Sequence, residues 1–100
     1  MKFANFLAAD RRLSILRVLQ EMPGCRCNHI VMQAALAALG HDVSRDTVAA
    51  DAVWLDGQRL LDARETESGV LVMTLLGYGA DVAAGRTTVP GVRRPETGGA

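Results

Sequence analysis

Residues 28–57, NHIVMQAALAALGHDVSRDTVAADAVWLDG, decide the fold of this 100-residue chain. Asn28 and Ser44 each stand directly before apolar residues that recur with a helical period. Both residue types favour the first position of a helix, because their side-chain oxygen accepts a hydrogen bond from a backbone N–H of the first turn. The stretch therefore predicts two helices, over 28–39 and 44–57, joined by a tight turn.

Two further helices are expected before this pair, over residues 3–8 and 11–22. Asp10 can cap the second of them through its carboxylate. The apolar side chains of this second helix cover more than half of a helical wheel, so we expect it to lie centrally and to pack against several neighbours. Pro23 and Gly24 end it.

A β-hairpin is expected after the pair, over residues 60–75. Apolar and polar residues alternate over 60–66, residues 67–69 form a turn, and residues 70–75 are apolar almost throughout, as in a second strand. A last helix follows over 76–84. It lacks a capping residue and contains Gly77 and Gly79, so its start should be weak, or held by something outside the chain. This order, mainly α with one small hairpin, predicts an α+β fold of the winged helix-turn-helix type.

The organisation expected is one domain over residues 1–85, followed by a tail over 86–100. The tail contains prolines, glycines and arginines with only two aliphatic residues, both valine. Such a composition buries little surface, which predicts a flexible basic segment.

Two sequence resemblances support the same fold. Residues 7–19, LAADRRLSILRVL, resemble the opening of winged-helix repressors of the ArsR type. Residues 35–48, ALAALGHDVSRDTV, resemble a family of short proteins encoded in Mu-like prophages, and so do the segments 81–86 and 89–95 near the end of the chain. The resemblance implies a winged helix and a prophage origin.

The same comparison implies a DNA-binding regulator of transcription as the function. In a helix-turn-helix, the N-terminal residues of the second helix meet base edges in the major groove. Arginine can read guanine there, and basic residues elsewhere neutralise phosphates. The expected DNA-binding residues are Ser44, Arg45, Thr47 and Ala50 on that helix, with Arg12, Arg64, Arg86, Arg93 and Arg94.

The charge distribution keeps a second function open. Residues 42–67 carry three arginines against seven acidic residues, although the whole chain has no net charge. Asp46, Asp51 and Asp56 lie on the helix that should face DNA. Close to phosphates these carboxylates would oppose binding. The alternative is a winged helix that presents its acidic helix and wing to a basic protein partner.

A homodimer is also expected, because in repressors of this type the first and last helices form the subunit interface. The residues that would form it are Phe3, Phe6, Leu7, Leu76, Val82 and Ala83. Alternatively, the first helix folds back on its own core. Trp54 is expected to anchor the helix over 44–57 against the hairpin.

Other functional classes have little support in the sequence. Cys25, Cys27 and His29 form an incomplete ligand set for zinc, so neither a metal nor another cofactor is expected. The sequence has no phosphate-binding loop or nucleophile motif, which argues against an enzyme. It also has no long apolar run and no apolar leader, which favours a cytoplasmic protein without a membrane span.

Overall fold

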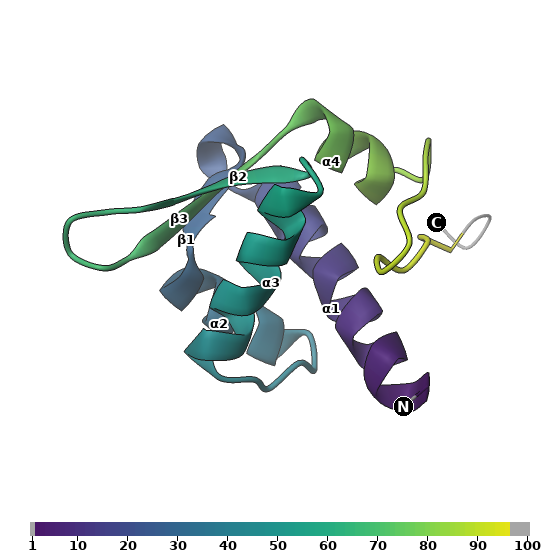
Figure 1. The fold of residues 1–100 in the computed structure, drawn as a ribbon, viewed down its shortest axis with the longest axis horizontal. Helices are drawn as coiled ribbons and strands as arrows, with labels where there is room; N and C mark the ends of the chain where they lie inside the picture. The colour runs from purple at the N-terminus through teal and green to yellow at the C-terminus, as the bar shows by residue number, and fades with distance from the viewer. Residues whose placement is uncertain (1, 97–100) are drawn as a thin grey trace.

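The computed structural model describes residues 2–96, which form an α+β domain of four α-helices and a three-stranded antiparallel sheet (Figure 1). The elements in chain order are α1 (Lys2–Glu21), a short 3-10 turn η1 (Pro23–Cys25), β1 (Arg26–Asn28), α2 (His29–Ala38), α3 (Arg45–Gly57), β2 (Leu61–Glu65), β3 (Leu71–Leu75) and α4 (Gly77–Ala83). None of the helices in this part of the chain is long and apolar enough to cross a membrane.

The N-terminal region is one unbroken helix, so the expected division into helices 3–8 and 11–22 is wrong. Alanine has the highest helix propensity, and the pair Ala8-Ala9 allows the helix to continue through the position where a break was expected. Asp10 does not act as a cap. Its carboxylate contacts His41 and Arg93 instead.

The two predicted caps at α2 and α3 are confirmed. The Asn28 side chain accepts a hydrogen bond from the Val31 N–H at 2.8 Å, and the Ser44 Oγ accepts one from the Thr47 N–H at 3.1 Å. Both helices start at the residue after their cap, as this chemistry requires.

The sheet contains the predicted hairpin and one strand that was not predicted. Strands β2 and β3 pair around the turn, with Leu61 opposite Leu75 and Glu65 opposite Leu71. Strand β1 pairs with the other edge of β3, which gives the order β1-β3-β2. No strand is predicted for this segment, because three residues are too few to show an alternating pattern.

An aliphatic core lies between the sheet and the helices. All four helices, the two hairpin strands and the turn before β2 contribute its fully buried side chains. These are Ile15, Leu16, Leu19, Met32, Leu36, Val48, Leu55, Leu60, Leu61, Met73 and Val82. α1 contributes three of them, which fits the central position expected for its second half.

Helix α4 is held from within the chain, by the turn that precedes β2. The Leu76 N–H donates to the Leu60 carbonyl at 3.1 Å. Gly79 is buried against the same peptide, and a Cβ at this position would collide with the Leu60 carbonyl oxygen. The glycine that seemed to weaken the helix therefore permits its close approach to the sheet.

The expected flexible tail is wrong for residues 86–96, which we call the C-terminal strap. Val89 and Val92 are buried against the core, and the Arg93 N–H donates to the Ala9 carbonyl at 3.0 Å. In Figure 1 the strap lies beside α1. Its two valines bury enough surface to order the segment, which its overall composition did not suggest. Residues 97–100 of the expected tail lie outside the described residues.

Candidate functional site

Three of the nine residues expected to meet DNA, Ser44, Arg45 and Thr47, lie at the N-terminus of α3. Ser44 caps the helix, and its hydroxyl lies 3.1 Å from that of Thr47. Arg45 is exposed, and its Nε donates to Gln33 Oε1 at 3.3 Å. The Gln33 amide in turn donates to the Val43 carbonyl at 2.9 Å. α2 therefore helps to orient the arginine.

Gln33 was not singled out in the sequence, although a signal was present. It is the one polar residue inside the otherwise apolar stretch 30–39. A polar side chain among apolar residues of a helix needs a hydrogen-bonding partner. The Gln33 amide has two, because its NH2 group donates to the Val43 carbonyl and its oxygen accepts from Arg45.

Two of the three acidic residues of α3 point toward the protein and not toward solvent. Asp51 is only 4% exposed and forms ion pairs with Arg11 and Arg12 of α1. Asp56 accepts a hydrogen bond from the Ala63 N–H at 2.7 Å, which ties α3 to β2. Of the three acidic residues of α3, Asp46 is the one that remains exposed.

Arg12 lies at a junction of α1, α3 and the strap, and its guanidinium is engaged by contacts within the chain. Besides Asp51, it donates to the Gly91 carbonyl at 3.0 Å, and its guanidinium lies 4.1 Å from the centre of the Trp54 ring. Trp54 was expected to anchor α3 against the hairpin. It instead packs beneath Arg12 and Gly91.

The other expected phosphate contacts are already partnered or lie apart from α3. Arg93 contacts Asp10 at 2.7 Å and Glu96 at 2.9 Å, and Arg86 contacts Asp81 at 3.2 Å. In the hairpin, Arg64 contacts Asp62 at 2.9 Å. Arg94 is exposed on the strap. The strap lies on the opposite side of the domain from the hairpin (Figure 1), so its arginines do not share a face with the hairpin.

Asp10 connects three segments through its carboxylate. His41 Nε2 lies 2.8 Å from one oxygen and the Arg93 guanidinium lies 2.7 Å from the other. Partial burial on its own would raise the pKa of Asp10, but these hydrogen bonds and charges outweigh it and hold the pKa below its ordinary value.

The residues expected at a dimer interface separate into two groups. Phe3, Phe6 and Leu7 are exposed on the first two turns of α1, and Leu76 is exposed before α4. Val82 and Ala83 are buried in the core of their own chain, so their assignment to a subunit surface is wrong. They face inward because α4 packs directly on α1.

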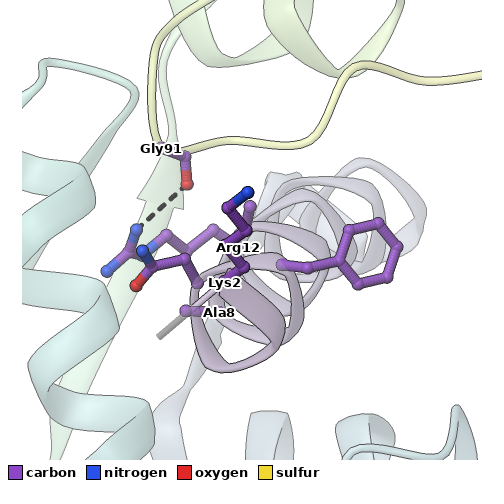
Figure 2. Close-up of a pocket in the computed structure, with 7 residues that line it drawn as sticks. Lys2, Ala8, Arg12 and Gly91 are labelled. Carbon is purple, nitrogen blue, oxygen red and sulfur yellow. Dashed lines mark hydrogen bonds between the residues drawn. The ribbon is translucent and has the colours of Figure 1, made fainter.

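A groove of about 580 Å³ runs between the start of α1 and the strap (Figure 2). Lys2, Asn5, Phe6, Ala8, Ala9, Arg12 and Gly91 line it. The Arg12 guanidinium points to the Gly91 carbonyl across its edge. Of the polar side chains that line this groove, Arg12 thus takes part in holding the strap.

The Cys25, Cys27 and His29 segment has structural roles in this chain. His29 Nδ1 accepts a hydrogen bond from the Leu71 N–H at 3.1 Å, and burial raises the pKa of the Cys27 thiol. Across residues 2–96, no three His, Cys, Asp or Glu side chains are grouped as a metal ion would require.

Comparison with known proteins places the chain among phage-associated proteins. Neither a protein-family model nor a solved structure matches it. It is 44% identical over 91 residues to the uncharacterized protein gp26 of Escherichia phage Mu, an alignment that covers 91% of this chain and 93% of gp26. It is also 36% identical over 75 residues to an uncharacterized protein of Haemophilus influenzae, covering 75% of this chain and 72% of that protein. The chain belongs to the family of small proteins that includes gp26 of phage Mu.

Proposed function

We propose that this protein is a winged helix-turn-helix that binds duplex DNA through α3 and acts as a phage regulator of transcription. The element order supports the proposal, since α2 and α3 would form the helix-turn-helix and the β2–β3 hairpin would form the wing. β1 would complete the sheet at the base of that wing.

The observation that carries the proposal is the composition of the outward face of α3. Because Asp51 and Asp56 point inward, Ala50 and the 62% exposed Val53 are presented outward, with Arg45 and the exposed Asp46 at the helix start. Small apolar side chains can contact the methyl group of thymine, and arginine can donate two hydrogen bonds to guanine. This helix fits a major groove better than its acidic composition suggests.

Affinity for phosphates should be low, because few cations are available on this side of the domain. At the start of α3 and in the hairpin these are Arg45 and Arg64, and the second already contacts Asp62. Each phosphate contact contributes about −0.9 to the slope of log affinity against log salt concentration. Since Arg45 is assigned to a base, Arg64 is left for phosphate, and we expect a slope of about −1 for one domain on its site.

Fluorescence anisotropy with a labelled duplex, taken from rounds of selection on a randomised library, tests the proposal. Wild-type protein should enrich a defined sequence, and Arg45→Ala should lower its affinity about 5- to 100-fold, as expected for loss of a base contact. Arg59→Ala, which removes an exposed arginine beyond the other end of α3, is the control and should bind normally. Failure to bind any duplex at low salt would refute DNA binding.

A basic protein partner is the second candidate, and the exposed acidic residues around α3 and the hairpin tip favour it. These are Asp42, Asp46, Glu65 and Glu67. If they form the contact, a synthetic lysine-rich peptide should bind at low salt, and Asp46→Lys with Glu67→Lys should abolish that binding. Unchanged binding by the double variant would exclude this surface as the site.

A further inference from the structure

Arg45 occupies a position of α3 at which a positive charge is unfavourable. It is the first residue of the helix, directly after the cap Ser44. The backbone N–H groups of a first turn carry a partial positive charge, so this end of a helix favours anions and disfavours cations. Asp46 in the same turn offsets this only in part. The arginine therefore does not stabilise its own helix, which points to a role other than stability.

Gln33 of α2 uses both ends of its side-chain amide beside this arginine. Its oxygen accepts a hydrogen bond from Arg45 Nε at 3.3 Å, and its nitrogen donates to the Val43 carbonyl at 2.9 Å. A guanidinium only donates and a carbonyl only accepts, so these two partners fix which end of the amide faces which. Val43 belongs to the turn between α2 and α3, and the two helices also pack on each other. The Gln33 oxygen is thus held in place beside the start of α3.

The contact leaves the far end of the guanidinium available. This group is planar and has five N–H donors, one on Nε and four on the two terminal nitrogens. Gln33 takes the Nε donor, and Arg45 is otherwise exposed. The two terminal nitrogens are the pair that can donate in parallel to O6 and N7 of one guanine.

We infer that Gln33 is the positioning residue for base reading by Arg45, and that it directs the two terminal nitrogens of the arginine toward a guanine. The inference rests on the proposed DNA binding through α3, and it adds one element of the target, a G·C pair opposite the start of that helix. A free arginine side chain loses rotamer freedom when it binds, which weakens the contact. Gln33 removes part of this loss before DNA arrives, and it does so without touching the DNA itself.

Nuclear magnetic resonance of the free protein tests the hold on Arg45 without DNA. The Arg45 Nε–H should exchange with water about 2- to 10-fold faster in Gln33→Leu than in wild type, because this substitution keeps the size of the side chain but removes both hydrogen bonds. Gln33→Glu separates the two bonds, since its carboxylate accepts from Arg45 but cannot donate to Val43. Its Nε–H should exchange as slowly as in wild type. Circular dichroism checks that both variants are folded.

Duplex binding measures the consequence for specificity. The relevant base pair is the G·C pair of the selected duplex at which Arg45→Ala loses its preference. Wild-type protein should prefer this duplex about 5- to 100-fold over the same duplex with A·T at that pair. Gln33→Leu should reduce the preference about 2- to 10-fold.

Two controls show whether Gln33 acts through the arginine. In an Arg45→Ala background, Gln33→Leu should change the preference no further, because the residue that it positions is already gone. Gln58→Leu makes the same substitution at an exposed glutamine directly after α3, and it should keep the wild-type preference.

The outcomes separate this inference from the proposed function. If wild-type protein selects a duplex and Gln33→Leu keeps the full preference for guanine, the inference is overturned while DNA binding stands. An equal effect of Gln33→Leu with and without Arg45 would also overturn it, because Gln33 would then act through the turn. Equal exchange of the Arg45 Nε–H in wild type and Gln33→Leu would reject the hold on the arginine whether or not DNA is bound. If no duplex binds to wild-type protein, the proposed function fails, and the reading of guanine by Arg45 fails with it.

Discussion

Asp51 connects the first helix to the helix proposed to face DNA. It is buried, and Arg11 and Arg12 contact its carboxylate from α1. Both arginine side chains are themselves mostly covered. The Asp51 carboxylate is therefore the counter-charge of two cations that are partly shielded from bulk water. Removing the acid would leave two partly buried cations without a counter-charge.

We therefore expect Asp51→Ala to lower the free energy of unfolding by about 3 kcal/mol. Urea unfolding followed by circular dichroism measures this as a lower midpoint. The matched control is Asp46→Ala on the exposed side of the same helix, which should change stability by less than about 0.5 kcal/mol. Similar midpoints for the two variants would show that the ion pairs do not hold α3.

Asp10 predicts a specific loss of stability in acid. Its pKa in the folded protein lies below that of the unfolded chain, so its contribution is fully present above about pH 4 and is lost as the pH falls through the folded pKa. Urea midpoints of wild type and Asp10→Asn should differ near neutral pH and converge below about pH 4. A difference that stayed constant to the lowest pH would contradict the paired carboxylate.

At the scale of the element, α4 depends on one glycine and not on the other. A Cβ at position 79 would collide with the Leu60 carbonyl, whereas nothing lies within 4 Å of a Cβ at position 77. Gly79→Ala should destabilise the fold by about 1–3 kcal/mol or more, because the obstacle is backbone. Gly77→Ala should leave stability unchanged or raise it by up to about 1 kcal/mol.

Thermal unfolding of both variants measures the difference. The result expected is a large fall in melting temperature for Gly79→Ala alone. Equal melting temperatures would mean that α4 does not pack on Leu60 as the structure shows.

The elements that could be predicted from the sequence are those with a local chemical signal. Asn28 and Ser44 predict the starts of α2 and α3, because capping depends on residues that are only a few positions apart in the sequence. The alternation within 60–66 and the turn at 67–69 predict the hairpin, because these signals are also local in the sequence. The pairing of β1 and the role of Asp10 depend on contacts with distant residues, such as Thr74 opposite Arg26 and Arg93 on Asp10, which no local pattern contains.

The same distinction explains the candidate site. Counting charges on 44–57 gives the net sign of α3 but not the direction of each side chain. Asp51 and Asp56 point inward because their partners, Arg11 and the Ala63 N–H, come from other elements. The place of Arg45 in the first turn of α3 could be predicted from the sequence, since it directly follows the cap Ser44.

At the scale of the whole molecule, the strap connects the C-terminal part of the domain to the N-terminal helix. It packs on α1 through Arg93 and Gly91, and on Trp54 of α3 through Gly91. Its closest approach is at Gly91, where a Cβ would come within 2.7 Å of the Trp54 ring. Gly91 also has a φ of +94°, which disfavours other residues. The position thus combines a backbone requirement with a steric one.

Gly40 separates these two requirements, because its φ is +95° but nothing lies within 4 Å of a Cβ there. Gly40→Ala should cost about 1 kcal/mol for the backbone alone. Gly91→Ala should cost about 1–3 kcal/mol more, because its methyl group must displace the strap from Trp54. Trp54 is the single tryptophan of the chain, so its fluorescence reports this contact directly. We expect its emission to shift to longer wavelength in Gly91→Ala and to stay unchanged in Gly40→Ala. Equal losses of stability with identical spectra would show that the strap is not seated on the ring, and the link between the C-terminal segment and α3 would then be absent.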